Sequence, residues 1–445
     1  MNLLIEQGRV IDPASGRDEV ADIAIADGRI LAIGQPPAGF APRRRIDARG
    51  CLVLPGVIDL CARLGEPGNE HARMLQSETR AAVAGGVTSV VCPPDTDPVL
   101  DEPGLVEMLK MRAERLRHSR VLPQGALTRG LKGEQITEMA ELSEAGCVAF
   151  GQADTPVANT RILARALQYA STYGYAVWLR PQDAWLGEGV AASGALATRM
   201  GLAGVPAAAE TIALHTLLEL LRAIGPGAGS PRLHICRLAS AKGVALLRQA
   251  RAEGLNVSAD VSIHHLLLTE ERIGYYDSAA RLLPPLRQEA DRAALAAAVA
   301  DGTIDAIVSD HTPVQADAKQ LPFAQAQPGA AALELLLPLA LQWGASAEGP
   351  GLMRALAALT HGPARVLGPA LAALPEGLGQ LAAGGVADLC LFDPAACWTA
   401  DPARLHSQGA ATPFAGQRLQ GRVRCTLVGG QIAHESDASD ESARP

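Results

Sequence analysis

Eight short apolar runs, each followed by a helical stretch, constrain the fold of this 445-residue chain more than any other feature. The runs are brief and mostly apolar, whereas the segments between them place apolar residues at i, i+3 and i+4. They span residues 57–60, 88–92, 120–124, 147–151, 175–179, 233–237, 256–262 and 305–310. Because eight consecutive βα units close into a parallel barrel, the sequence predicts an α/β fold built on a (β/α)8 TIM barrel.

The two ends of the chain predict a second, smaller β domain. Residues 20–34 alternate apolar and polar side chains around an Asp-Gly pair, which is a strong hairpin signal. Similar alternation returns at 386–394 and 421–435. We therefore expect both termini to build one small β-sandwich, followed by a polar, acidic and disordered tail. The expected boundaries are 1–54 and 366–430 for the small domain, 55–365 for the barrel and 431–445 for the tail.

Composition narrows the range of partners and compartments. A net charge of −8 and an aromatic content of 3% argue against nucleic-acid binding. Eight scattered cysteines without a C-x-x-C pair are typical of reduced thiols rather than a disulfide framework. The chain shows neither a secretory N-terminus nor a run of 18 apolar residues, so we expect a cytoplasmic protein with no membrane partner.

Several longer motifs carry a resemblance to a known family. They are PGVIDL at 55–60, EPG at 66–68, AAVAGGVTSVVCPPDTDP at 81–98, HHLLL at 264–268, PPLR at 284–287, DGTIDAIVSDHTP at 301–313 and VADLCLFDP at 386–394. Through them the chain resembles the class I dihydroorotases, which hydrolyse a cyclic amide in pyrimidine biosynthesis. The resemblance implies a barrel of the amidohydrolase type, with its site at the carboxyl ends of the strands.

The resemblance also implies functional positions, and most of them hold other residues in this chain. The two metal-binding histidines that follow the family's first strand correspond to Cys61 and Arg63. Of the family's functional residues, only the carboxylate after the eighth strand is retained, as Asp310. The other changed positions are Gly65 and Asp95 at substrate contacts, Gln152 and Ala153 at the acidic pair, Arg180 and Arg237 at later histidines, and Leu283 and Val314 at further substrate contacts.

These changes predict the loss of the metal centre. Arginine has no lone pair to donate, and guanidiniums gathered at one point repel cations. We therefore expect no zinc and no other cofactor, and a chain that is not an enzyme. Arg63, Arg180 and Asp310 are expected to form a metal-free charge network. The register of the sixth strand leaves open whether His234 rather than Arg237 occupies the ligand position.

The resemblance is most specific to a noncatalytic dihydroorotase homologue. In some bacteria that homologue assembles with the catalytic chain of aspartate carbamoyltransferase in a large hetero-oligomer. It implies a structural subunit and that partner for this chain. Two alternatives remain: an amidohydrolase with a mononuclear metal site, formed by Cys61, His234 and Asp310, and an arginine-lined mouth that binds a small anion.

Overall fold

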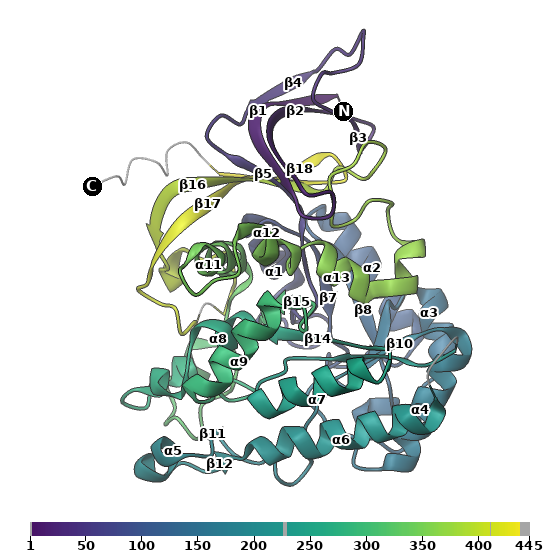
Figure 1. Ribbon diagram of the computed structural model, residues 1–445, viewed down its shortest axis with the longest axis vertical. Coiled ribbons are helices and arrows are strands. Elements are labelled where there is room, and N and C mark those ends of the chain that lie inside the picture. The colour runs from purple at the N-terminus through teal and green to yellow at the C-terminus, as the bar shows by residue number, and fades with distance from the viewer. Residues whose placement is uncertain (1, 226–228, 410, 437–445) are drawn as a thin grey trace.

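The computed structural model describes residues 2–225, 229–409 and 411–436, and within them the predicted parallel barrel is confirmed. Its strands are hydrogen bonded in the order β15-β14-β13-β10-β9-β8-β7-β6. An isolated bridge between Ala62 and His311 joins the segments that follow the two end strands and brings the barrel close to closure (Figure 1). The strands are β6 (Val57–Asp59), β7 (Val87–Cys92), β8 (Arg120–Ala126), β9 (Ala149–Gly151), β10 (Ala176–Leu179), β13 (Arg232–Ile235), β14 (Val257–Ser262) and β15 (Ala306–Val308).

Helices surround the barrel, and local sequence fixes where some of them begin and end. Helix α4 begins after Asn159, whose side chain accepts hydrogen bonds from Arg161 N and Ile162 N, and it ends at Gly174 in the left-handed conformation. The longer helices are α1 (Leu75–Ala84), α2 (Pro103–Leu116), α3 (Met139–Ala145), α4 (Thr160–Tyr173), α6 (Ala207–Ile224), α7 (Ala241–Ala252), α9 (Glu289–Ala300), α11 (Leu333–Ala345) and α13 (His361–Leu367). Shorter elements are α5 (Ala195–Met200), α8 (Ile263–Leu267), α10 (Ala316–Gln320), α12 (Leu352–Ala357), β11 (Ala191–Ala192), β12 (Gly204–Val205) and the 3-10 turns at Arg129–Leu131, Glu270–Ile273, Ser278–Ala280, Gly368–Ala373 and Pro402–Arg404.

The small domain combines both termini, as the sequence predicts, and lies at one end of the molecule (Figure 1). Its strands form one hydrogen-bonded sheet in the order β18-β17-β16-β5-β1-β2-β3, with β4 paired to β1, rather than the two separate sheets that a sandwich implies. The strands are β1 (Leu3–Asp12), β2 (Arg17–Ala26), β3 (Arg29–Ile33), β4 (Arg44–Asp47), β5 (Leu52–Pro55), β16 (Leu389–Thr399), β17 (Arg418–Val428) and β18 (Gln431–Glu435).

Two sequence expectations about this domain have different outcomes. The hairpin at Asp27-Gly28 is present, since β2 pairs with β3 across it. The boundary at residue 430 is wrong, because β18 pairs with β17 and extends the sheet to Glu435. The expected disorder of the tail falls largely on residues 437–445, which lie outside the described residues.

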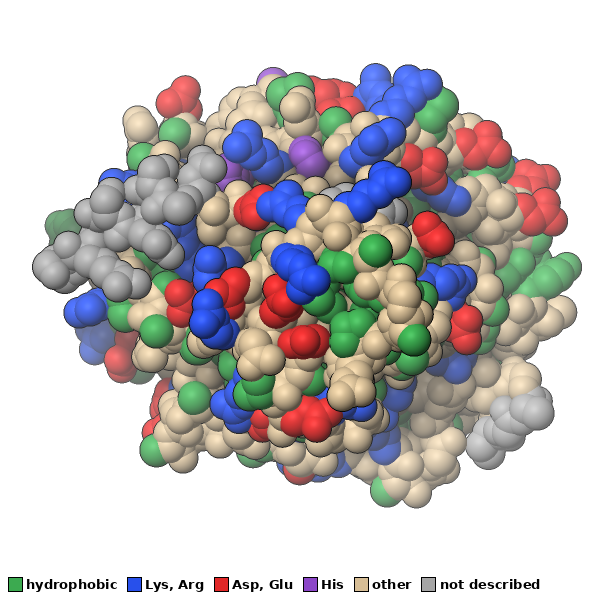
Figure 2. All heavy atoms as spheres, turned by 90° about the horizontal axis from the view of Figure 1, so that it is seen from above, with side chains coloured by type: hydrophobic (Ala, Val, Ile, Leu, Met, Phe, Trp, Pro, Cys, Tyr) green, Lys and Arg blue, Asp and Glu red, His purple; other side chains and the backbone are tan. Residues whose placement is uncertain are grey.

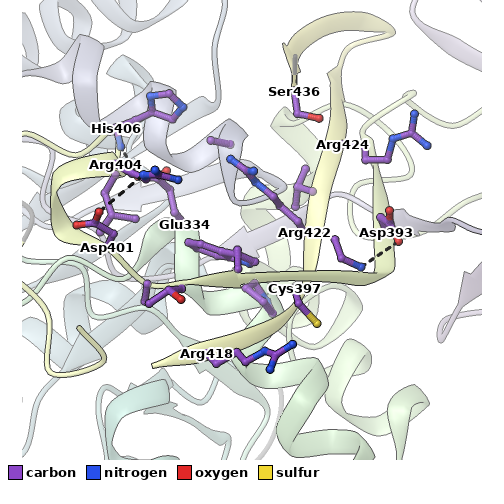
Figure 3. Close-up of a pocket in the computed structure, with 18 of the residues that line it drawn as sticks. Glu334, Asp393, Cys397, Asp401, Arg404, His406, Arg418, Arg422, Arg424 and Ser436 are labelled. Atoms are coloured by element: carbon purple, nitrogen blue, oxygen red, sulfur yellow. Dashed lines mark hydrogen bonds and ion pairs between the residues drawn. The ribbon is translucent and has the colours of Figure 1, made fainter. Parts of the chain in front are cut away.

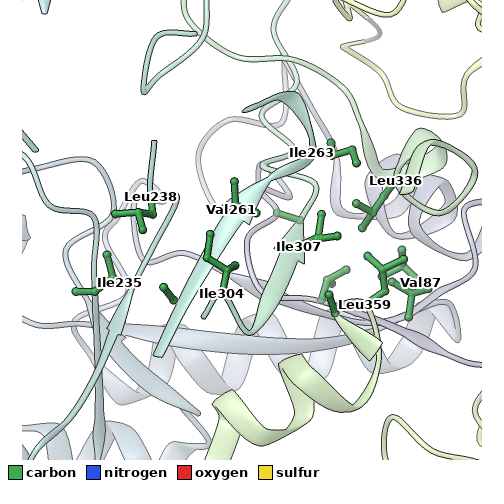
Figure 4. Packing of buried hydrophobic residues seen from close by; sticks show 14 of the residues in the cluster. Val87, Ile235, Leu238, Val261, Ile263, Ile304, Ile307, Leu336 and Leu359 are labelled. Carbon is green, nitrogen blue, oxygen red and sulfur yellow. The ribbon is translucent and has the colours of Figure 1, made fainter. Parts of the chain in front are cut away.

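Apolar residues pack on both faces of the barrel strands, because alternate side chains point inward and outward. Inside the barrel, Ile58, Val91 and Trp178 are buried in one cluster. Outside it, residues such as Ile235, Val261 and Ile307 pack toward the helices (Figure 4). Among the residues that the structure describes, no helix has the length and apolar character needed to cross a membrane.

Helix α11 is buried along most of its length, and it contacts both domains. It contacts α1 and α12 of the barrel as well as β17 of the small domain. Its residues Leu335, Leu336 and Leu337 are completely buried, so apolar side chains surround the helix on successive faces. The position of the small domain on the barrel therefore depends on the packing of this helix.

Shortening Leu336 to Ala should lower the free energy of unfolding by about 2–5 kcal/mol, because the removed methyl groups leave a cavity in a close-packed core. Urea denaturation followed by circular dichroism measures the change. Leu321→Ala is the control, since that side chain is 47% exposed and its loss should cost less than about 0.5 kcal/mol. Equal effects of the two substitutions would contradict this account of the core.

Candidate functional site

Charged side chains from several strand ends meet at the carboxyl-terminal mouth of the barrel. Arg63, four residues past β6, places Nε 2.7 Å from Asp95 Oδ2 and Nη2 2.6 Å from Asp154 Oδ2. Its Nη1 donates to Thr312 Oγ1 at 2.8 Å. Burial alone would lower the pKa of Arg63, but Asp95 and Asp154 raise it above its ordinary value. Arg63 is therefore a fixed positive charge in the mouth.

Asp154 is the centre of the charged cluster. Its carboxylate accepts hydrogen bonds from Arg63, from Arg180 Nε at 2.6 Å and from Arg237 Nη2 at 2.6 Å. Arg180 Nη2 also donates to the backbone oxygen of Asp154 at 3.0 Å. Burial acts to raise the pKa of Asp154, but the three guanidiniums hold it well below its ordinary range. One carboxylate thus neutralises part of the charge of three arginines.

The retained carboxylate, Asp310, is paired with Arg237 rather than with the expected Arg63 and Arg180. Its Oδ1 lies 3.1 Å from Arg237 Nη1 and 3.9 Å from Cys61 Sγ. Burial raises the pKa of Asp310 to about 6 and the pKa of the Cys61 thiol well above its ordinary value. The expected network of Arg63, Arg180 and Asp310 is therefore replaced by one in which Asp154 holds both of those arginines and Arg237 bridges to Asp310.

Sequence reasoning missed Asp154 as a partner. It lies just after the Gln152-Ala153 pair and is out of register with the acidic positions that the family resemblance implies. Ala153 takes a left-handed backbone conformation with φ of 49°, which turns the chain toward the mouth. A search for any acidic residue near the ends of strands that carry arginine would have found it.

The remaining predicted site positions lie around this cluster without joining it. Gln152 exchanges hydrogen bonds with Thr128, and Val314 is buried. Leu283 contributes only its backbone oxygen, 3.4 Å from Arg237 Nη1. Gly65 has φ of +83°, and a Cβ there would lie 2.1 Å from the backbone oxygen of Arg73, so the clamp arginine of the family does not fit at this position.

A second cluster lies inside the barrel, next to the mouth. Donor atoms of His234, Cys236 and Asp260 all lie within 4.8 Å of one another. His234 Nε2 is 2.8 Å from Asp260 Oδ2, and its Nδ1 is 2.8 Å from Ser258 Oγ. The backbone N–H of Arg237 donates to Asp260 Oδ1 at 2.7 Å, which connects this cluster to the charged mouth.

These three residues fit a single zinc ion in donor chemistry. Imidazole, thiolate and carboxylate are the ligands that catalytic zinc uses, three at a time with one position left open. The Ser258 hydroxyl on His234 Nδ1 would act as the outer partner that orients a ligating imidazole. Burial raises the pKa of Cys236 well above its ordinary value, but a thiol that bound zinc would release its proton to solvent and coordinate as the thiolate. The arginine-lined mouth, by contrast, does not fit a metal pair.

A groove of about 1140 Å³ lies outside the barrel, between β16, β17 and α11 (Figure 3). Arg404 and Arg418 are exposed on its lining, which also includes Trp398 of β16, whose Nε1 donates to Gly421 O of β17 at 3.0 Å. Glu334 also lines it, and burial raises the pKa of that carboxyl to about 8. Seen from the small-domain end, basic and acidic side chains are interspersed over the surface (Figure 2).

Comparisons with known proteins identify relatives over the whole chain. Residues 50–243 match a model described as dihydro-orotase-like, and residues 211–433 match the amidohydrolase family. A dihydroorotase-like protein of Pseudomonas aeruginosa is 45% identical over 98% of this chain and 100% of its own length. A dihydroorotase of Anaeromyxobacter dehalogenans is 42% identical over 98% of this chain and 99% of its own. The L-hydantoinase structure from Arthrobacter aurescens aligns with a TM-score of 0.83 at 24% identity, over 98% of this chain and 96% of its own, and supports the fold.

These findings confirm the dihydroorotase-like resemblance and correct two predictions. The prediction that the chain is not an enzyme is contradicted, because relatives that span it at 41–42% identity are named dihydroorotase. The prediction that no zinc is bound is contradicted by the family and by the His234, Cys236 and Asp260 cluster. The prediction rested on Arg63, Arg180 and Arg237, which lie at the mouth, whereas the candidate ligands lie within the barrel.

Replacing Asp310 by Asn should change the pH dependence of stability. Because burial raises the pKa of Asp310 to about 6, the folded chain keeps a proton that the unfolded chain loses near its ordinary pKa. The linked stabilisation is fully present below about pH 4 and is lost as pH rises through 6. The melting temperature of the native chain minus that of D310N should therefore fall between about pH 4 and 6 and then level off. A difference that stays constant from about pH 4 to 8 would contradict the buried, protonated carboxyl.

Proposed function

Because the chain belongs to the dihydroorotase-like branch of the amidohydrolase family, we propose that it hydrolyses a cyclic amide such as dihydroorotate at an altered, single-metal site. One observation carries the proposal. The donor atoms of His234, Cys236 and Asp260 lie within 4.8 Å of one another, directly beside the charged barrel mouth. The site would be mononuclear because three arginines occupy the mouth, where a second metal would have to bind.

In this proposal the chain's own residues bind and orient the substrate and transfer protons to and from it. A bound zinc ion would supply Lewis acidity and an activated water. Asp310, with a pKa raised to about 6, is suited to take up a proton at its carboxylate and return it near neutral pH. The guanidiniums at the mouth are hydrogen-bond donors, and such donors would favour an anionic cyclic amide over a neutral one.

Metal content and hydrolysis should both depend on Cys236. Replacing Cys236 by Ala removes one of three proposed ligands, so we expect bound zinc to fall below stoichiometric amounts and ring opening of dihydroorotate to fall at least about 100-fold. Mass spectrometry of the metal and a spectroscopic hydrolysis assay measure the two effects. Cys397→Ala is the matched control, since Cys397 is exposed on β16. Equal zinc and equal activity in both variants would refute the proposed ligand set.

We also propose that the chain assembles with the catalytic chain of aspartate carbamoyltransferase. The support is the motif resemblance together with the groove between β16, β17 and α11, where Arg404 and Arg418 are exposed to a partner. The Arg404 side chain is 79% exposed and its Nε lies 3.8 Å from Asp401 Oδ2, a loose surface pair that a contact with an acidic segment of the partner would replace.

Reversing the charge of the groove should weaken this assembly. The double substitution Arg404→Glu and Arg418→Glu should reduce co-purification of the carbamoyltransferase chain, and the loss should be greater at low salt, where such contacts are strongest. The double substitution Arg161→Glu and Arg165→Glu, at exposed positions on α4, makes the same change of surface charge outside the groove and should leave co-purification intact. If the unmodified chain never associates with the carbamoyltransferase, the assembly proposal is wrong.

A further inference from the structure

A small pocket lies at the amino-terminal end of the barrel, opposite the charged mouth. Arg232 is the first residue of β13, Asn256 precedes β14 and Asp305 precedes β15, so the starts of three neighbouring strands form its rim. Trp178 and His234, which are partners on neighbouring strands, are buried and line its inner side. The pocket has a volume of about 70 Å³. That is room for a few water molecules or for one small anion.

Two arginines of this pocket lack an acidic partner. Among the described residues, no carboxylate oxygen lies within 4.0 Å of a side-chain nitrogen of Arg232 or Arg365. Arg232 Nη2 donates to the backbone oxygen of Arg365 at 3.4 Å. Asp305 also lines the pocket, but its carboxylate is already paired with Arg251 and accepts from Ala259 N at 2.9 Å. Two guanidiniums therefore lie beside the pocket without a counter-charge.

The indole N–H of Trp178 is a buried donor of the same pocket. Trp178 is 2% exposed, and its Nε1 has no hydrogen-bond partner among the described residues. Trp343 Nε1 also lacks a partner, but Trp178 differs because it lines a pocket beside two guanidiniums that have no counter-charge. A buried donor without an acceptor is unfavourable, so an acceptor bound in the pocket would gain this hydrogen bond.

The ring of His234 separates the pocket from the mouth. His234 Nδ1 lies 2.8 Å from Ser258 Oγ, and Ser258 lines the pocket. His234 Nε2 lies 2.8 Å from Asp260 Oδ2, and the other oxygen of Asp260 accepts from the backbone N–H of Arg237 at the mouth. A ligand in the pocket and a ligand at the mouth would therefore lie on opposite sides of this ring, and substitutions can distinguish them.

We propose that this pocket binds a small tetrahedral oxyanion, either inorganic phosphate or the phosphate group of a larger solute, between Arg232, Arg365 and the N–H of Trp178. The donors belong to β13, α13 and β10, so they reach the pocket from different directions. A tetrahedral oxyanion presents acceptor oxygens in several directions, whereas a carboxylate presents two in one plane. Because Arg365 and Asn256 are exposed at the rim, a phosphate group can enter while the rest of its molecule stays outside. The inference does not depend on the proposed hydrolysis.

Phosphate titration of the full chain tests the inference. At constant ionic strength, sodium phosphate should raise the melting temperature saturably and change the tryptophan fluorescence, because Trp178 would contact the ligand. Arg365→Met should raise the dissociation constant, measured by titration calorimetry, at least about tenfold, since it removes a charge-assisted contact. Trp178→Phe keeps an aromatic ring without the N–H, so it should raise the constant about three- to tenfold and remove the fluorescence change. Arg161→Met, at an exposed position on α4, is the matched control and should bind phosphate as the native chain does.

The other outcomes also decide the question. Equal stabilisation by chloride, or a dissociation constant that is unchanged in Arg365→Met or Trp178→Phe, would overturn the inference. Tighter binding of acetate than of phosphate would overturn the ligand class. Methyl phosphate separates the two sources, because tighter binding of the ester supports a larger solute, whereas tighter binding of inorganic phosphate supports the free ion. If Trp178→Phe fails to fold, Arg365→Met still decides, since Arg365 is exposed on α13.

Discussion

The shared carboxylate of Asp154 is the interaction on which the organisation of the barrel mouth depends. Three guanidiniums, reaching in from the ends of β6, β10 and β13, would repel one another without it. Because the mouth is largely buried, the dielectric screening that separates surface charges is weak there. Asp154 therefore ties together strand ends that are far apart in the sequence, and Arg237 extends the same network to Asp310 and, through its backbone, to Asp260.

The network also determines what chemistry the mouth and the barrel interior can support. Arginines at the mouth exclude cations and favour anions, whereas the imidazole of His234, the thiol of Cys236 and the carboxyl group of Asp260 provide metal donors one layer deeper. The two clusters lie next to each other and have opposite preferences. An anionic substrate held by the arginines at the mouth would thus lie beside the candidate metal site. The arginines themselves cannot bind a metal ion, because they have no lone pair to donate.

The fold could be predicted in detail because its signals are local. Each barrel run carries its own apolar pattern, and the Asp27-Gly28 turn specifies its hairpin through two residues. The single sheet of the small domain was harder to predict. β5 pairs with β1 on one side and with β16 on the other, so the sheet joins segments from opposite ends of the chain, which no short window of sequence reveals.

The site shows the same division between local and long-range information. The sequence by itself determined the α/β barrel through the periodicity of its apolar runs. Its motifs carried the resemblance to the family, and that resemblance placed Arg63, Arg180, Arg237 and Asp310 near the strand ends. Only the tertiary structure decided that Asp154 is the common partner and that His234, Cys236 and Asp260 lie together. Those pairings depend on side-chain direction across neighbouring strands and on the left-handed turn at Ala153, and such three-dimensional proximity is not encoded in any single stretch of the chain.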